Sequence, residues 1–316
     1  MASFPPLKTN NTDNTDNTDN KKKKKNRFRF LDSIWYILIF IFVWYMLVAS
    51  LLEGSLSELV ERSEGLPPAM IFILSTYTMT IFSVVLLLLL CLFPKNRAIG
   101  KSFIPNKKDR SWMKFGIGLI LGFATNFICI LCALIHGDIS LYFDFAAGGI
   151  PVMLFAFLSV FIQSSSEELW TRGFMYERLN VRYPLWVAML VNGIFFGFLH
   201  IFNPGANFLS IFSICVTGVS YSLLRWYSGS IWTCMGIHTM WNFTQNFLFG
   251  LPNSGLVSQV SIFHMSALRA TSNPIYNYEF GVEGAIPAIL VDAAVGIVCL
   301  LLGKKDGRLG ELRGKK

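Results

Sequence analysis

Long apolar runs dominate this chain of 316 residues and leave few folds open to it. Each of eight stretches holds between 17 and 25 mostly apolar residues. A helix that crosses a bilayer needs about 20 such residues. We therefore predict an all-α fold, a polytopic membrane bundle of about eight transmembrane helices. The predicted spans are 33–52, 69–93, 115–136, 150–166, 183–202, 208–226, 230–249 and 284–302.

The composition excludes several other classes of protein. Hydrophobic residues make up 53% of the chain and charged residues only 15%, whereas soluble domains carry about 25% charged residues. A disordered chain would be poor in apolar residues. All six cysteines lie inside apolar runs, so we interpret them as small buried hydrophobes and predict no disulfide framework. Cys129 and Cys132 form a C-x-x-C spacing, which without partner ligands is a weak signal for a metal or redox site.

The basic residues predict how the bundle is oriented. Of the 27 lysines and arginines, 25 fall in alternate connections and in the two end segments. Because basic residues accumulate on the cytoplasmic side, we predict that both termini are cytoplasmic. The net charge of +8 suggests nucleic-acid binding at first sight, but these charges flank apolar segments. We therefore expect no nucleic-acid partner.

Three regions follow from this pattern. Residues 1–32, with three Asn-Thr-Asp repeats and a run of five lysines, form a disordered polar and basic cytoplasmic tail. Residues 33–302 form the transmembrane bundle, with a catalytic core at 150–249, and 303–316 form a basic cytoplasmic tail. Basic residues next to a span anchor its topology, and they can also bind anionic lipid.

Ionisable groups within apolar segments are costly and indicate function. Glu168 and Arg172 are four residues apart, so on a helix they share a face in the order that favours an ion pair. Glu167 points about 100° away from Glu168. One carboxylate is thus neutralised and structural, while Glu167 is free to face a cavity as a general base.

Two further pairs have the same four-residue spacing. His238 and Asn242 share a face of the seventh span and can both donate hydrogen bonds, as an oxyanion hole requires. Phe196 shares a face of the fifth span with His200, where an aromatic ring would exclude water. A lone intramembrane histidine often only bonds a neighbouring helix. Several polar or ionisable side chains on nearby spans favour one common site, because within a membrane they can find hydrogen-bond and charge partners only in one another.

Three other ionisable residues are poorer candidates. His136 lies at the predicted end of a span and His264 lies in an external connection, so we expect both to be solvent-exposed and non-catalytic. Asp292 lies in the middle of the eighth span without an obvious partner. We expect it to cap a polar network or to line the cavity.

The three motifs together resemble a known family. Residues 167–172 match E-E-x-x-x-R, residues 196–200 match F-x-x-x-H, and residues 238–242 match H-x-x-x-N. Their order and spacing resemble the CPBP intramembrane proteases, also called the Abi family, which include CAAX prenyl endopeptidases and bacteriocin-processing or immunity proteins. The resemblance covers about residues 150–249.

The resemblance implies a helical bundle with a water-filled cavity near the membrane boundary. It implies that Glu167 and His200 together activate water, that His238 and Asn242 stabilise the oxyanion, and that Glu168 and Arg172 support the site. On straight helices Glu167 lies at the cytoplasmic end of its span and His200 lies deeper. Their contact then requires a tilted fourth helix or a later start of the fifth.

A metal is the main open question about cofactors. Glu167, His200 and His238 could ligate zinc. We favour a metal-free reaction without any cofactor, because no H-E-x-x-H motif is present and Asn242 is a poor zinc ligand but a good oxyanion donor.

The function that these residues favour is that of an intramembrane endopeptidase. We expect its partner to be a membrane-associated protein or peptide cleaved near the cytoplasmic boundary, and a multi-pass location, in the cell membrane if the host is bacterial. The alternative is a non-catalytic bacteriocin-immunity or scaffold protein of the same fold. A transporter is less favoured, since the chain contains no inverted repeat or pair of broken spans.

Overall fold

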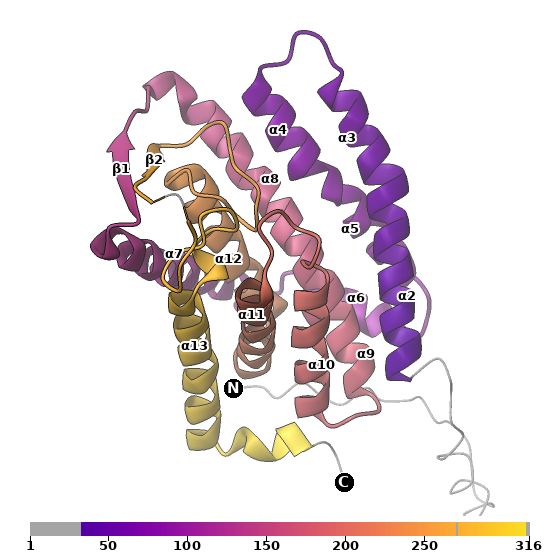
Figure 1. Ribbon diagram of the computed structural model, residues 1–316. Coiled ribbons are helices and arrows are strands. Elements are labelled where there is room, and N and C mark those ends of the chain that lie inside the picture. Colours follow the sequence, from indigo (N-terminus) through magenta and orange to yellow (C-terminus); the bar gives the residue numbers. More distant parts are fainter. Residues whose placement is uncertain (1–32, 270, 314–316) are drawn as a thin grey trace, which may run out of the picture.

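The structure is a computed structural model that describes residues 33–269 and 271–313, and helices make up most of it (Figure 1). Each of the eight predicted spans coincides with helical structure. The predicted disordered tail at 1–32 lies outside the described residues, as do residues 314–316. The main helices are α2 (Ile34–Leu47), α4 (Pro68–Thr76), α5 (Ile81–Cys91), α7 (Ser111–His136), α8 (Ile150–Glu168), α10 (Leu185–Phe198), α11 (Phe208–Ser228), α12 (Ile231–Phe243) and α13 (Ile286–Lys305).

Shorter elements join these helices. Short α-helices are α3 (Gly54–Glu61), α6 (Arg97–Phe103) and α9 (Tyr176–Asn180). Stretches of π-helix are η2 (Val48–Glu53), η5 (Leu169–Met175) and η6 (Thr244–Leu248), and 3₁₀ turns are η3 (Thr78–Thr80), η4 (Ala147–Gly149), η7 (Val282–Gly284) and η8 (Arg308–Arg313). The strands β1 (Ile139–Phe143) and β2 (Phe263–Ala267) pair antiparallel, with Leu141 opposite Met265.

Five helical segments within the described residues are long and apolar enough to cross a membrane. They are Pro68–Cys91, Ser111–His136, Ile150–Asn180, Phe208–Ser228 and Ile286–Lys305. Two further apolar helices, at Ile34–Trp44 and Leu185–Phe198, are shorter. The prediction of an all-α polytopic bundle is confirmed, while the count of eight spans and the cytoplasmic placement of the termini stay predictions.

The fourth apolar segment continues as a helix beyond its predicted span. The span is predicted to end at Ser166, and its helix to continue into the polar stretch that follows. The structure confirms the continuation, since α8, η5 and α9 form one helical segment of 31 residues, Ile150–Asn180. Glu167 and Glu168 therefore lie within this segment and not at its end.

The connections alternate between the two ends of the bundle. The turn between α3 and α4 and the β1–β2 pair lie at the upper end in Figure 1, while the start of α2, the α9–α10 turn and the end of α13 lie at the lower end. This alternation agrees with the distribution of lysine and arginine. The last segment, predicted as a basic tail, is helical up to Arg313, and Glu311 of η8 accepts a hydrogen bond from Trp226 Nε1 over 2.9 Å.

Glycines bring four helices into close pairs. Gly118 and Gly122 of α7 face α12, and a Cβ at Gly122 would collide with the carbonyl oxygen of Ile237. Gly193 and Gly197 of α10 face α11 in the same way, and a Cβ at Gly193 would lie only 2.5 Å from Val219 Cγ2. Both pairs have the G-x-x-x-G spacing that lets membrane helices approach closely. The second pair holds the end of α10, with Phe196 and His200, against α11.

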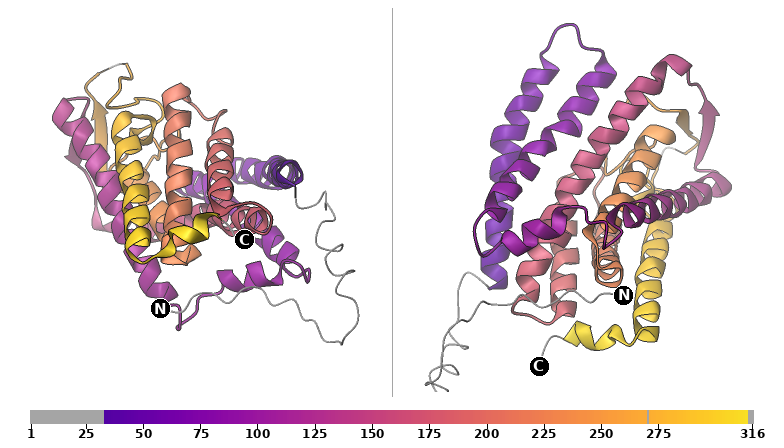
Figure 2. Two further views of the ribbon diagram at one scale, coloured as in Figure 1. Left: turned by 90° about the horizontal axis from the view of Figure 1, so that it is seen from below. Right: turned by 180° about the vertical axis from the view of Figure 1, so that it is seen from behind.

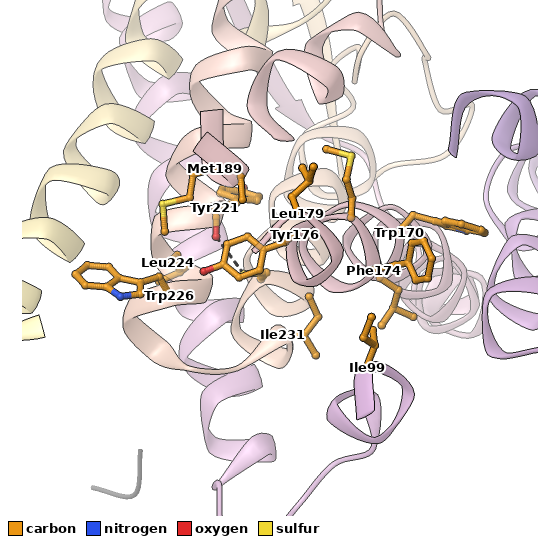
Figure 3. Packing of buried hydrophobic residues seen from close by; sticks show 14 of the residues in the cluster. Ile99, Trp170, Phe174, Tyr176, Leu179, Met189, Tyr221, Leu224, Trp226 and Ile231 are labelled. Atoms are coloured by element: carbon orange, nitrogen blue, oxygen red, sulfur yellow. Dashed lines mark hydrogen bonds between the residues drawn. The ribbon is translucent and has the colours of Figure 1, made fainter. Parts of the chain in front are cut away.

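A large apolar core surrounds the π-helical segment η5 (Figure 3). Trp170 and Phe174 of η5 pack beside Ile99 of α6, while Tyr221 and Leu224 of α11 close the opposite side. Each of these side chains is buried. Because η5 contains Arg172, this packing fixes the arginine within the bundle.

The connection between α12 and α13 folds back onto the bundle. Asn246 Nδ2 donates to the carbonyl oxygens of Leu251 and Leu256 over 3.0 and 2.9 Å, and Gln245 Nε2 donates to the carbonyl oxygen of Pro252 over 2.5 Å. Asn203 Nδ2 donates to the carbonyl oxygen of Ser254 over 3.1 Å. We expected an external connection here, but these bonds make it part of the wall around the functional site.

The glycine contacts predict a matched pair of substitutions on α7. Gly122→Ala forces a methyl group against the backbone of α12 and is expected to destabilise the fold by about 1–3 kcal/mol. Gly116→Ala is the control, because a Cβ at Gly116 meets nothing within 4 Å. Thermal unfolding in detergent measures the difference. Equal melting temperatures for the two variants would contradict the close packing of α7 on α12.

Candidate active site

A cavity of about 100 Å³ lies between α8, α10, α11, α12 and the connections that follow α10 and α12. All four residues predicted to be catalytic line it. Its walls are formed by Tyr77, Gln163, Glu167, Phe196, His200, Asn203, Ile214, Thr217, Tyr221, His238, Trp241, Asn242, Asn253, Ser254, Leu256 and Glu283. The structure thus brings together side chains that are far apart in the chain.

The buried carboxylate of Glu168, beside the cavity, contacts two side chains at once. Glu168 Oε1 accepts a hydrogen bond from Arg172 Nη1 over 3.0 Å, and both side chains are fully buried. The same oxygen lies 2.9 Å from His238 Nδ1. A carboxylate beside an arginine can only accept, so Nδ1 of His238 carries the hydrogen. The expected pair of Glu168 and Arg172 therefore also orients His238.

Phe196 lies at the centre of the charged groups. The guanidinium carbon of Arg172 lies 4.1 Å from the centroid of the Phe196 ring, within the range of a cation–π contact. The same ring lies 4.8 Å from the His200 ring and 6.1 Å from the His238 ring, centroid to centroid. Phe196 therefore separates the buried arginine from the cavity and contacts both imidazoles.

Glu167 presents one unoccupied oxygen near the cavity. Its Oε1 accepts a hydrogen bond from Gln163 Nε2. Its Oε2 lies 3.9 Å from His238 Nε2 and has no hydrogen-bond partner within the described structure. Gln163 also accepts from Asn242 Nδ2 over 3.2 Å, so it links the carboxylate to the amide. No motif in the sequence indicates Gln163, although a glutamine four residues before Glu167 in an apolar run is a usable signal.

The expected contact between Glu167 and His200 is absent from the described part of the chain. His200 Nδ1 lies 2.8 Å from the carbonyl oxygen of Phe196, at the end of α10. The only imidazole that the structure places within 4 Å of Glu167, among the described residues, is that of His238. The reason is that His200 is held by its own helix end, while Gln163 holds Glu167. Both side chains still line the same cavity.

Glu283 is a second carboxylate in the cavity wall, and no motif indicated it. Its Oε2 accepts from Trp241 Nε1 over 3.1 Å, and its Oε1 accepts from Ser254 Oγ over 2.6 Å. Burial raises the pKa of Glu283, while the hydrogen bonds from Ser254 and Trp241 oppose that rise. Glu283 thus ties the connection after α12 to the helix that carries His238 and Asn242.

Asp292 has the partner that its sequence context did not reveal. Thr217 Oγ1 of α11 donates to Asp292 Oδ2 over 2.5 Å. Thr217 lines the cavity, whereas Asp292 lies behind it, fully buried. Asp292 therefore ends a short polar network that reaches the cavity.

The remaining candidate groups lie elsewhere. His136 Nδ1 lies 2.9 Å from Asp138 Oδ2, and His264 Nε2 lies 3.3 Å from the carbonyl oxygen of Asp144, so both histidines are outside the cavity. The six cysteines are free thiols. Within the described residues, no three histidine, cysteine, aspartate or glutamate side chains are gathered as a metal ion requires, so Glu167, His200 and His238 do not form a ready zinc site.

Comparison with known proteins assigns the region that forms this site. Residues 149–244 match the model of the Rce1-like family, described as type II CAAX prenyl endopeptidase. The match covers 96 of the 316 residues and shows that this region is similar to the Rce1-like family. All three motifs lie within the match, so the resemblance seen in the sequence is confirmed. The family as a whole is one of intramembrane proteases of the CAAX type.

A curated relative and the apolar helices add to this assignment. The chain is 30% identical over 139 residues to the uncharacterized protein YyaK of Bacillus subtilis (strain 168), and this alignment covers 43% of each protein. The chain thus matches less than half of the length of that relative. No solved structure matches the chain. The family and the five long apolar helices make this a multi-pass membrane protein.

Two ion pairs with the same spacing predict unequal effects on stability. Arg172→Gln leaves Glu168 buried without its cation, so we expect a loss of about 3–5 kcal/mol in the free energy of unfolding. Arg62→Gln removes the same kind of pair from Glu58, but both side chains there are exposed, and about 0.5 kcal/mol or less is expected. Denaturation in mixed micelles measures both. Equally small losses in the free energy of unfolding of the two variants would show that the buried Glu168 is tolerated without Arg172.

Proposed function

We propose that this protein is an intramembrane endopeptidase that hydrolyses a peptide bond of a membrane-associated protein or peptide. The observation that carries the proposal is the cavity lined by Glu167, His200, His238 and Asn242. These are the residue types needed for water activation and for stabilising a tetrahedral oxyanion. By analogy with the family, the substrate carries a CAAX end. Cleavage near the cytoplasmic boundary stays a prediction, because Asn203 and residues 253–256 of the cavity wall lie in connections that the predicted orientation places on the opposite side.

Glu167 is the proposed general base. Its unoccupied Oε2 can accept a proton from a water molecule in the cavity. The carbonyl oxygen of Phe196 can only accept, so His200 Nδ1 carries a hydrogen and Nε2 of the neutral ring is left as an acceptor. Glu167 Oε2 and His200 Nε2 can each accept a hydrogen bond from the same water molecule, one on each side of it. The water oxygen then attacks the peptide carbonyl carbon, and the proton it gives up passes to the leaving amine as the C–N bond breaks.

His238 and Asn242 are the proposed oxyanion donors. His238 Nδ1 donates to Glu168, so donation from Nε2 as well requires a doubly protonated ring. Asn242 Nδ2 donates to Gln163 Oε1 and Ser164 Oγ, each over 3.2 Å. One of these two bonds must give way to the oxyanion. Such bonds are often long before substrate binds and rearrange in the complex.

The size of the cavity constrains how a substrate enters. About 100 Å³ holds a few water molecules, whereas ligand pockets are several times larger. A peptide therefore has to displace part of the wall. Among the described residues, the segment from α2 to α5 contributes only Tyr77 to that wall, while residues 253–256 are fixed by several hydrogen bonds. Entry between helices is thus favoured over opening of the 253–256 segment.

The central test compares membrane peptides from cells that carry the intact protein or a variant. Glu167→Gln and His200→Ala are each expected to abolish the new peptide termini while the protein still folds and inserts. His264→Ala is the matched control, because His264 lies outside the cavity. Peptides that persist in both cavity variants would reject the protease. A bacteriocin-immunity or scaffold role would instead survive His200→Ala in a complementation assay.

A second test concerns the metal. We propose that the reaction needs none, since Glu167, His200 and His238 are not gathered as a metal site among the described residues. Cleavage by the purified protein is expected to be unchanged by a zinc chelator. Activity that vanishes with the chelator and returns with zinc would show that the three side chains close around a metal in the active enzyme.

A further inference from the structure

A large groove, separate from the catalytic cavity, opens at the end of the bundle where α6 and the end of α13 lie (Figure 2). Its volume is about 3200 Å³. No residue of the described chain lines both this groove and the catalytic cavity. Two chemically different parts make up its wall: an apolar furrow between α7 and α13, and a basic mouth.

The furrow is formed by one face of each of two helices. Helix α7 contributes Ile117, Leu121 and Ile128, and α13 contributes Val295 and Val298. The two helices touch, but α7 is steeply inclined to α13, so they diverge along their length (Figure 2). Ile117, Ile128 and Val298 are about half exposed. The furrow is therefore an apolar surface that the acyl chain of a lipid can cover.

The mouth gathers cations from separate elements. Lys107, Lys108 and Arg110 lie in the turn before α7, Lys114 lies in its first turn, and Arg225 lies in the last turn of α11. Arg308 of η8 completes this basic mouth. Lys114 lies within electrostatic range of Asp109, which attracts it, and of Arg225 and Arg308, which repel it.

The acidic residues that line the groove are too few to neutralise this cluster. Asp109, Glu177, Asp306 and Glu311 line it together with the six cations named above and with five more, Lys95, Lys101, Arg178, Arg182 and Arg313. Arg225 pairs with Glu177 over 3.0 Å, and Arg308 pairs with Glu311 over 3.1 Å. Within the described residues, Lys107, Lys108 and Lys114 make no ion pair, and the buried Nε of Arg225 has no hydrogen-bond partner. Cations held together at a cost in repulsion indicate that an anion belongs between them.

We propose that this groove binds one anionic phospholipid, with its phosphate headgroup at the basic mouth and its acyl chains in the furrow between α7 and α13. The occupant has to be amphipathic, because the charged and apolar parts are continuous. Basic pockets between membrane helices bind acidic headgroups on the cytoplasmic side, where the lysine and arginine pattern places this end. The proposal does not depend on the protease function.

The experiment titrates the full chain, delipidated in neutral detergent, with phosphatidylglycerol or phosphatidylcholine and counts bound lipid by native mass spectrometry. One phosphatidylglycerol is expected to bind about tenfold more tightly than phosphatidylcholine. Lys107→Gln with Lys108→Gln is expected to remove that preference. The matched control is Lys304→Gln with Lys305→Gln, an adjacent pair at the same end of the bundle that does not line the groove.

A second pair of variants tests the acyl chains. Val298→Trp fills the furrow and is expected to weaken phosphatidylglycerol binding about tenfold, whereas Ile297→Trp, a similarly exposed neighbour outside the groove, leaves it unchanged. Soluble glycerol phosphate is expected not to compete at equal concentration. Equal binding of the two lipids, equal losses in the two lysine variants, no effect of Val298→Trp, or displacement by glycerol phosphate would each overturn the proposal.

Discussion

The candidate site depends on a single buried carboxylate that serves two helices. Glu168 accepts from Arg172 in its own helical segment and from His238 on α12. A buried charge is tolerated only when its partners compensate it, so these three groups have to fold together. The contacts among Glu168, Arg172 and His238 fix how α8 and α12 face each other. It also leaves the adjacent Glu167 pointing toward the cavity with one oxygen unoccupied.

The surroundings of this triad explain why the cavity is both polar and rigid. Phe196 covers the guanidinium group of Arg172 and borders both imidazoles. Gln163 joins Glu167 to Asn242, and Glu283 joins the connection after α12 to Trp241. Side chains of a catalytic site act well only when neighbouring groups hold them in place. Here these neighbours come from both inside and outside the segment that matches the Rce1-like family.

Periodicity and spacing were enough to predict the main helices and five of the residues that line the cavity, namely Glu167, Phe196, His200, His238 and Asn242. The four-residue spacing of Glu168 and Arg172 leads directly to their ion pair. Apolar length alone could not reveal that the segment after Ser166 stays buried, because its arginine and glutamates indicate a polar boundary until their partners are known. Glu283 could not be predicted either. Its role follows from contacts with Trp241 and Ser254, and these depend on how a long connection folds back.

We propose that Glu167 and His200 act on one water molecule although they do not touch. A double-mutant cycle tests this most directly, with single-turnover cleavage of an identified substrate peptide by the Glu167→Gln, His200→Ala and doubly substituted proteins. Groups that act as a unit are strongly non-additive. The account predicts that the double variant is no slower than the slower single variant. A rate reduced by the product of the two single losses would show that the residues act independently.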